Sequence, residues 1–227
     1  MTSIPAKTKL AIFDIDGTLT DSVFVHQKAF HSALRNAQLT PYDDDFSKYK
    51  HHTDSYIANT IFSFHRQRNM TDEDISRFEN DVYRFTFKYL KGKPFSEIPG
   101  AVAFVNYLHL YTPYAVIYAT GSFHRLALYK LSIGFPNVNE SLLFSCNREQ
   151  VRERIVLNAI KNAKNFYKIS SYKKIIAFGD GIWDWKVAQN LGIDFIAVGF
   201  NCRQTFADFS CQEYFDDFMG QQLLFEN

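Results

Sequence analysis

The sequence predicts an α/β fold, namely a doubly wound parallel sheet that carries an inserted all-helical segment. Five short apolar runs, which have the character of buried strands, alternate along the 227 residues with helical patterns. Such alternation is typical of parallel sheets. About a hundred residues without a strand pattern separate the first two runs, too many for a loop or a single crossover helix. The hydrophobic content of 46% is sufficient for a packed core.

Each predicted strand is an apolar run that ends at polar or turn-forming residues. The five runs cover residues 10–13, 114–119, 142–145, 173–178 and 195–198.

The long stretch between the first two strands has helical apolar spacing, so it must form structure of its own. We expect helices over 23–34, 54–69, 71–90 and 100–110, and Thr71 followed by Asp74 resembles a helix-start signal. The last of these helices leads straight into the second strand and is assigned to the core. The predicted domains are a core, residues 1–20 and 97–227, and a helical cap, residues 21–96.

Composition and charge exclude several classes of protein. The formal net charge is +1, with Lys and Arg scattered along the chain, so nothing indicates binding to nucleic acid or to an acidic membrane surface. The three cysteines lack metal-ligand spacing and are expected to be free thiols in a reducing compartment. No apolar stretch approaches the roughly 20 residues that span a bilayer. We therefore expect a soluble cytoplasmic protein, and a monomer.

Two of the predicted strands end in pairs of carboxylates. The first strand runs into Asp14 and Asp16, and the fourth runs into Asp180 and Asp184. A single Asp-x-Asp-Gly sequence is equally compatible with an ordinary turn, but two acidic strand ends are not so easily explained. Ligands bind at the carboxyl ends of parallel strands, and carboxylate oxygens are good ligands for Mg²⁺. The sequence thus predicts a magnesium site at this edge.

Four motifs follow one another in a characteristic order. They are DIDGTLTDS at 14–22, Thr120-Gly121-Ser122 after the second strand, a basic helix start near Arg152, and GDGIWD at 179–184. Together they make the chain resemble the haloacid dehalogenase superfamily of phosphohydrolases, from end to end. Within it, the chain resembles the group of phosphoglycolate phosphatase and β-phosphoglucomutase, whose helical cap follows the first motif.

This resemblance implies roles for the acidic residues. Asp14 would be the nucleophile that forms an aspartyl-phosphate. Asp16 would be the general acid and base, and would lend its backbone carbonyl to Mg²⁺. Asp180 would complete the metal site, with Asp184 in direct or water-mediated support; Asp184 at a helix N-terminus is the alternative.

Phosphate-binding candidates lie next to these motifs. Thr120 ends an apolar run, so its hydroxyl and the Gly121 amide can point at the strand-end crevice and suit a phosphoryl oxygen. A helix-capping Thr is the alternative interpretation. Ser122 and Gly17 complete the set of phosphate-binding candidates in the core.

The basic residue has three candidates: Arg148, Arg152 and Arg154. With Asn147 as N-cap and Gln150 at the third position, a helix would begin at about Arg148. Arg152 then falls near the centre of the apolar face, Arg148 falls close to it, and Arg154 points to the opposite side. We therefore predict Arg152 as the clamp for Asp14 and phosphate, with Arg148 in reserve.

The cap is expected to set the choice of substrate. His26 lies twelve residues after Asp14 and matches a histidine that assists proton transfer in β-phosphoglucomutase; a solvated histidine on a helix face is the alternative. Lys50, His51 and Thr53 belong to a polar stretch that matches the substrate-contacting loop of the cap. Asp54 stands where the mutase has an arginine for a second phosphate, which argues against a bisphosphate intermediate.

The function that these residues predict is a Mg²⁺-dependent phosphatase that acts on a small phosphorylated metabolite. A phosphomutase is the nearest alternative. A catalytically idle binding protein of the same fold is another, because Trp183 and Trp185 are bulky for a strand-end loop. A true dehalogenase is disfavoured, since such enzymes need no metal and lack an acid at the position of Asp16.

Overall fold

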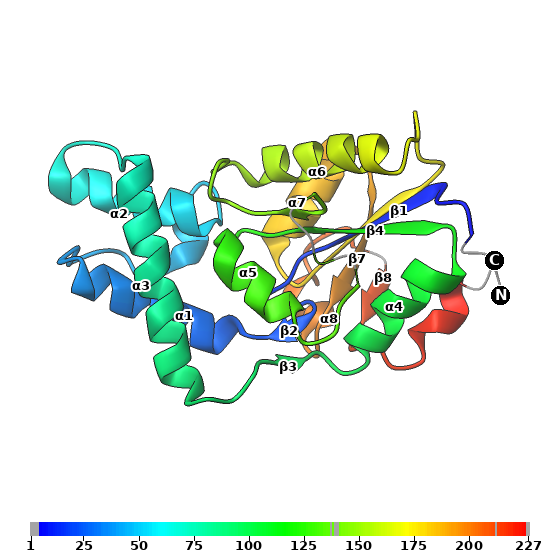
Figure 1. The fold of residues 1–227 in the computed structure, drawn as a ribbon, viewed down its shortest axis with the longest axis horizontal. Helices are drawn as coiled ribbons and strands as arrows, with labels where there is room; N and C mark the ends of the chain where they lie inside the picture. The colour runs from blue at the N-terminus through cyan, green and yellow to red at the C-terminus, as the bar shows by residue number, and fades with distance from the viewer. Residues whose placement is uncertain (1–4, 137, 139–140, 212, 226–227) are drawn as a thin grey trace.

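The computed structural model describes residues 5–136, 138, 141–211 and 213–225. A six-stranded parallel sheet forms its centre, in the order β5-β4-β1-β6-β7-β8. The strands are β1 (Lys9–Phe13), β4 (Tyr114–Ala119), β5 (Leu143–Phe144), β6 (Ile175–Gly179), β7 (Asp194–Val198) and β8 (Glu213–Phe215). Helices cover both faces, and three further helices lie beyond one end of the sheet (Figure 1). The doubly wound α/β fold is confirmed.

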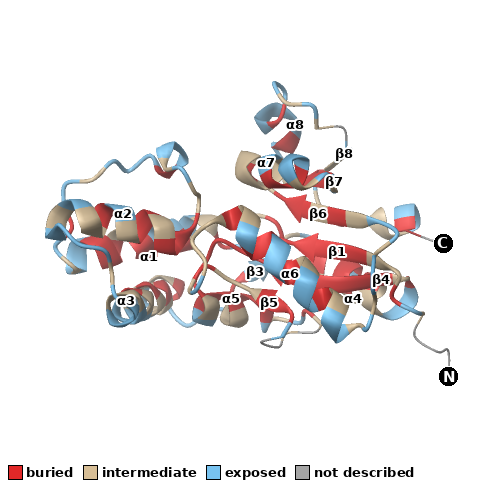
Figure 2. Cartoon of the chain, turned by 90° about the horizontal axis from the view of Figure 1, so that it is seen from above, coloured by how far each residue is buried: buried red, intermediate tan, exposed pale blue. Residues whose placement is uncertain are grey.

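The helices on the two faces bury alternate residues of the strands. On one face, α4 (Ala101–Tyr111) and α5 (His124–Leu131) pack over Phe13 and its neighbours. On the other, α6 (Arg152–Phe166) and α7 (Ile182–Leu191) pack over Ile12 and its neighbours. Figure 2 shows the central strands buried, with exposed residues on the outer surfaces of the helices. Short elements, α8 (Cys202–Thr205) and the 3₁₀ helix η2 (Gln221–Phe225), follow β7.

The strand order brings together residues that are far apart in the sequence. β1 lies between β4 and β6, with Phe13 in register with Tyr118 on one side and Phe178 on the other. The carboxyl ends of these three strands therefore lie side by side. In open α/β sheets this edge is where ligands bind.

The three helices predicted for the insertion form, although the second ends three residues early, and a short 3₁₀ helix that was not predicted lies between the first two. In chain order, these elements are α1 (Val23–Asn36), the 3₁₀ helix η1 (Phe46–Lys48), α2 (Asp54–Arg66) and α3 (Asp72–Leu90). Thr71 and Asp74 form a reciprocal capping box at the start of α3, which confirms that helix-start signal. β2 (Thr20–Asp21) and β3 (Ser96–Glu97) pair as a two-stranded antiparallel ribbon, close to the predicted domain boundaries.

Three local expectations differ from the structure. The predicted helix start at Arg148 is wrong, because α6 begins at Arg152 with Val151 as its N-cap. The Asn147 side chain does not cap that helix; it accepts a hydrogen bond from the His124 amide and donates one to Glu79 of α3. β8 and the β2–β3 ribbon were not expected either, since these segments of two or three residues contain no apolar run.

The described helices include none with the length and apolar character that a membrane crossing requires.

Candidate active site

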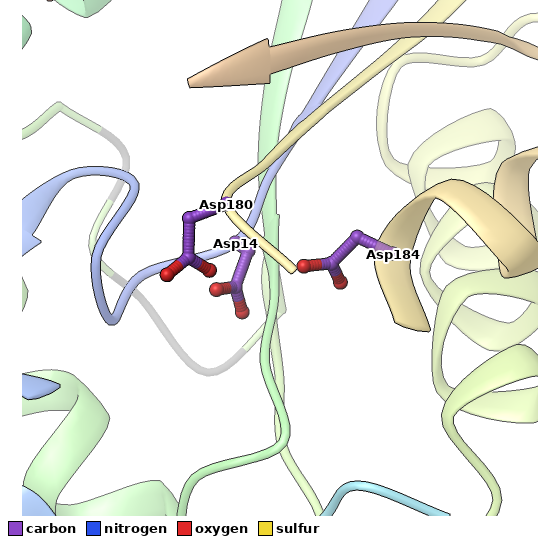
Figure 3. A group of neighbouring side chains, drawn as sticks. All are labelled: Asp14, Asp180 and Asp184. Carbon is purple, nitrogen blue, oxygen red and sulfur yellow. The ribbon is translucent and has the colours of Figure 1, made fainter. Parts of the chain in front are cut away.

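Three carboxylates converge at the carboxyl ends of β1 and β6. Asp14 follows β1, Asp180 follows β6, and Asp184 lies in the first turn of α7. One oxygen from each lies within 4.8 Å of the others, and the three side chains point toward one another (Figure 3). Such a cluster of oxygens suits a hard divalent cation.

The cluster carries more negative charge than its protein surroundings balance. Burial, together with the nearby carboxylates Asp184 and Asp16, raises the pKa of Asp14 to about 7, although Arg152 opposes the rise. Burial and the negative charges of Asp14 and Asp184 raise the pKa of Asp180 well above its usual range. Burial also raises the pKa of Asp184. A bound cation would relieve this repulsion, so the donor set fits Mg²⁺ in charge as well as in ligand type.

Arg152 is the cation that the structure places against the cluster. Its Nη2 lies 2.7 Å from an Asp14 oxygen and 2.6 Å from an Asp184 oxygen, and its Nε donates to Asp184. It is buried as the first residue of α6, on the same face as Ile155. Of the three arginine candidates, Arg152 alone is at the site. Arg148 is exposed and precedes the helix, and the Arg154 side chain is 69% exposed.

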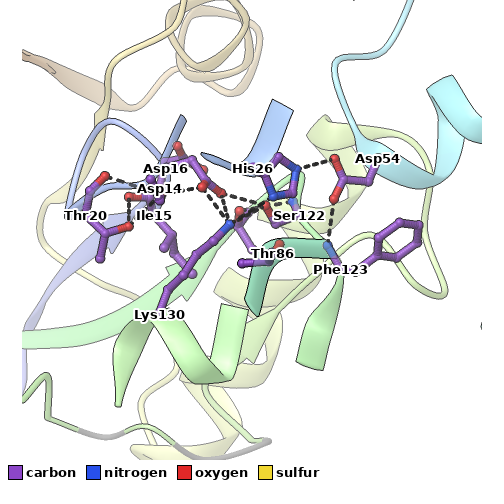
Figure 4. Close-up of polar contacts among 12 residues, drawn as sticks. Asp14, Ile15, Asp16, Thr20, His26, Asp54, Thr86, Ser122, Phe123 and Lys130 are labelled. Carbon is purple, nitrogen blue, oxygen red and sulfur yellow. Dashed lines mark hydrogen bonds and ion pairs between the residues drawn. The ribbon is translucent and has the colours of Figure 1, made fainter. Parts of the chain in front are cut away.

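Asp16 does not join the carboxylate cluster. Its oxygens lie 2.6 and 2.7 Å from the Lys130 ammonium, and they accept hydrogen bonds from the hydroxyls of Ser22 and Ser122 (Figure 4). Burial works against ionisation, but Lys130 outweighs it and holds the pKa of Asp16 far below its usual range. The Asp16 side chain is therefore a carboxylate in this structure, and the predicted metal ligation by Asp16 gains no support from its side chain.

Lys130 was not predicted from the sequence. Its side chain is fully buried, although it is a cation in a helix of the core. The same signal that singled out Arg152 could have identified Lys130. Lys130 is next to Leu131 and four residues after Leu126, so all three lie on the buried face of α5. A charged residue on an apolar face needs a partner of opposite charge.

His26 and Asp54 extend this network into the helical segment. His26 Nε2 lies 2.9 Å from an Asp54 oxygen, and His26 Nδ1 lies 3.2 Å from the Lys130 nitrogen. Asp54 also accepts a hydrogen bond from the Phe123 amide. His26 is buried, so the solvated alternative for this residue is wrong. The network Asp16–Lys130–His26–Asp54 thus links the core to α1 and α2 (Figure 4).

The two glycine candidates are needed for close packing. A Cβ at Gly121 would lie 2.4 Å from Arg152 Nη1, so only glycine fits beside the guanidinium. Gly17 has a φ of +76°, and a Cβ there would lie 2.1 Å from an Asp180 oxygen. Since the Gly17 amide donates to the Thr20 carbonyl, it is not free for phosphate. Gly17 therefore makes room for Asp180 rather than facing the cavity.

Thr120 and Ser122 both line the cavity above the carboxylates. The Thr120 hydroxyl accepts a hydrogen bond from the Ser122 amide at 3.1 Å, which fixes the turn after β4. As a hydroxyl it still has its proton to donate to an anion.

The loop before α2 contributes different residues from those predicted. Thr53 lines the cavity and donates to the Gln150 carbonyl, but Lys50, which is exposed, and His51, which is partly buried, do not line it. His52, which was not predicted, does: its ring stacks on Trp183 with centroids 3.6 Å apart. The two histidines are adjacent and lie outside any regular helix or strand, so no periodicity distinguished His51 from His52.

These residues enclose a cavity between the core and the helical segment. Its empty volume, including the mouth open to solvent, is about 660 Å³.

The Asp16–Lys130 pair gives a prediction about stability. Lys130→Met should lower the free energy of unfolding at pH 7 by roughly 3 kcal/mol, because it leaves a buried carboxylate without its cation. The pKa of Asp16 is lower in the folded protein than in the unfolded chain. The ion pair therefore stabilises the fold at pH values above the pKa of Asp16 in the unfolded chain, and this stabilisation is lost as the pH falls. The difference between parent and variant should therefore shrink below about pH 4. Denaturant unfolding at several pH values measures it.

The control for that experiment is Lys161→Met, which removes a cation from an exposed position of α6. It should change stability little at any pH. A loss for Lys130→Met that is equally small, or that does not depend on pH, would contradict the ion pair.

Comparisons with known proteins agree with this arrangement. The profile of the haloacid dehalogenase-like hydrolases matches residues 8–192. A search of curated proteins found no significant match. The fold is similar to that of a hydrolase from Pseudomonas syringae, with 21% identity, a TM-score of 0.67, and coverage of 94% of this chain and 96% of the other.

Two further solved structures share the fold. CbbY from Rhodobacter sphaeroides, in complex with phosphate, is 14% identical, with a TM-score of 0.68 and coverage of 96% of each chain. A predicted phosphoglycolate phosphatase from Haemophilus somnus is 16% identical, with a TM-score of 0.60 and coverage of 96% of this chain and 98% of the other. At these identities the likeness concerns the fold. The profile match covers most of the sequence, and the chain therefore belongs to the haloacid dehalogenase-like hydrolase family.

Proposed function

We propose that the protein is a Mg²⁺-dependent phosphatase that hydrolyses a small phosphate monoester through an aspartyl-phosphate on Asp14. The observation that carries this proposal is the convergence of Asp14, Asp180 and Asp184 beside a cavity, with Arg152 in contact with Asp14 and Asp184. A structural neighbour that was solved with phosphate adds support.

Asp14 is the proposed nucleophile. Its carboxylate attacks the phosphorus atom, the bond to the alcohol oxygen breaks, and water later cleaves the acyl phosphate. Arg152, already in contact with Asp14, is placed to orient that carboxylate and to bind a phosphoryl oxygen. The Thr120 hydroxyl is a second donor for the phosphoryl group. Mg²⁺, held by Asp14, Asp180 and Asp184, would supply positive charge that offsets the repulsion between carboxylate and phosphate.

Asp16 and Lys130 are the proposed proton carriers. As an ionised carboxylate, Asp16 suits the second step, in which it accepts a proton from the attacking water. In the first step the leaving oxygen needs a proton, and the Lys130 ammonium, hydrogen-bonded to Asp16, is the nearest source. The proton would pass from Lys130 to Asp16 and on to the alcohol, and it would return when water is deprotonated.

The helical segment is proposed to act as a cap that excludes water and contacts the substrate. Its residues Phe30, Phe46 and Ile57 line the same cavity as the carboxylates. A phosphomutase is less well supported. It would need a cation for a second phosphate, whereas Asp54 brings a negative charge to that side.

The decisive experiment is a turnover screen of phosphate monoesters with and without Mg²⁺. We expect release of inorganic phosphate that a chelator abolishes and that requires no added bisphosphate. Turnover only in the presence of a bisphosphate would favour the mutase, and failure to hydrolyse any ester would contradict the proposal.

A prediction for the metal site concerns Asp180→Ala. Loss of one carboxylate ligand should raise the Mg²⁺ concentration for half-maximal rate by at least about tenfold. The measurement is a Mg²⁺ titration of the initial rate, with Asp194→Ala, an exposed acid on β7, as control. An unchanged titration for Asp180→Ala would remove this residue from the metal site.

A further inference from the structure

Part of the cavity lining that comes from the helical segment is apolar. It consists of Val23 and Phe30 from α1, Phe46 from η1 and Ile57 from α2, which we call the apolar wall. The rings of Phe30 and Phe46 meet edge to face, with centroids 5.3 Å apart. None of these side chains has a hydrogen-bond donor or acceptor. A group that lies against them is stabilised by leaving water only if it is itself apolar.

The positive charges around the cavity are already engaged, as far as the described residues show. Arg152 contacts Asp14 and Asp184, and its Nη1 donates to the His52 carbonyl. Burial and the proximity of Arg152 lower the pKa of His52 to about 4, so this ring is uncharged at neutral pH. On the helical side, His26 is engaged between Asp54 and Lys130. This leaves no free cation beside the apolar wall.

A second negative charge on a substrate would therefore be poorly accommodated. A carboxylate or a further phosphate would lose its water without gaining a cation, and it would lie on the same side as Asp54. The hydroxyl groups of a sugar would also gain no hydrogen bond from the apolar wall, because none of its four side chains has a polar atom. Binding of an unpaired polar group in such a place is strongly disfavoured.

We infer that the alcohol half of the substrate is uncharged and apolar, an alkyl or aryl group that packs on Val23, Phe30, Phe46 and Ile57 while the phosphate faces Asp14 and Arg152. This inference rests on the proposed phosphatase function and adds the class of substrate to it.

The test compares two esters of matched size and leaving group. 3-Methylbutyl phosphate and the phosphate ester of 3-hydroxypropanoate have the same number of non-hydrogen atoms, and both release a primary alcohol. They differ in that an isopropyl group replaces the carboxylate. With Mg²⁺ present, kcat/KM for the apolar ester should exceed that for the carboxylate ester by at least about tenfold.

A variant that adds a cation should narrow this difference. Gln27 lines the cavity but is exposed on α1, so Gln27→Lys is expected to fold normally. It should raise kcat/KM for the carboxylate ester relative to the apolar ester by about tenfold. Gln67→Lys, an equally conservative change at the exposed C-terminal end of α2, is the matched control and should leave the ratio unchanged.

The outcomes separate this inference from the function on which it rests. Mg²⁺-dependent hydrolysis of both esters without a preference for the apolar one would overturn the inference and leave the phosphatase intact. An unchanged ratio in Gln27→Lys would overturn the argument that a missing cation sets the preference. Hydrolysis of neither ester, nor of any other monoester, would overturn both.

Discussion

Asp14→Asn is expected to lower kcat/KM by at least about a thousandfold, because an amide is a poor nucleophile. The substitution keeps the size and shape of the side chain, and its amide oxygen can still accept a hydrogen bond from Arg152. The folded protein should therefore persist. The measurement is phosphate release in saturating Mg²⁺ from whichever ester the parent protein hydrolyses.

The same variant makes a second, independent prediction about stability. The pKa of Asp14 is raised to about 7 in the folded protein, so folding is opposed by its ionisation as the pH rises through that value. An uncharged Asn avoids this loss. In a chelator, the stability of Asp14→Asn relative to the parent should rise between about pH 4 and pH 7 and reach its full value at pH 8, as measured by thermal unfolding.

Asp208→Asn, an exposed substitution, serves as the control and should alter neither activity nor the pH dependence of stability. Activity of Asp14→Asn within about tenfold of the parent would exclude Asp14 as the nucleophile.

Arg152→Ala should reduce kcat/KM by at least about a hundredfold, whereas Arg154→Ala should have little effect. The two arginines are two residues apart on α6, yet they differ in every relevant respect. Arg152 is buried and contacts two carboxylates of the cluster, while Arg154 is exposed with an oxygen of Glu149 at 3.9 Å. Steady-state kinetics on the same ester measures both variants.

A third variant separates charge from geometry. Arg152→Lys keeps the charge but loses the planar fork that contacts Asp14 and Asp184 together, so it should recover only part of the activity. Equal losses in Arg152→Ala and Arg154→Ala would mean that the guanidinium next to Asp14 has no role in turnover.

The fold was predictable because its main signals are long or repeated. Continuous apolar runs identified all five of the longer or more central strands, and helical periodicity identified α1 to α4. The acidic motifs predicted which strand ends meet, since parallel strands bring their carboxyl ends to one edge. β8 escaped because its sequence, Glu-Tyr-Phe, is not a continuous apolar run, whereas the equally peripheral β5 lies in the apolar run Leu142-Leu143-Phe144.

Details of the site were less predictable because they depend on contacts between distant residues. The sequence pattern that predicted Asn147 as a helix N-cap was misleading. The Asn147 side chain instead accepts a hydrogen bond from the His124 amide and donates one to Glu79. Nevertheless Arg152 was correctly placed on the buried face, because the apolar spacing of α6 fixes that face wherever the helix begins. Lys130 carries the same signal as Arg152, a cation on the buried face of a helix, but it lies outside the four motifs and was missed for that reason.

The β2–β3 ribbon has a consequence for how the two parts of the chain vary. Thr20 pairs with Glu97 and Asp21 with Ser96, so the chain leaves the sheet region and returns to it at adjacent points. A segment whose two ends are adjacent can be lengthened, shortened or exchanged without altering the register of the strands that it interrupts. The apolar wall can then change in sequence while the carboxylates at the end of the sheet stay in place. Replacing the segment between Asp21 and Ser96 with another helical segment is therefore the direct way to give this core a new specificity.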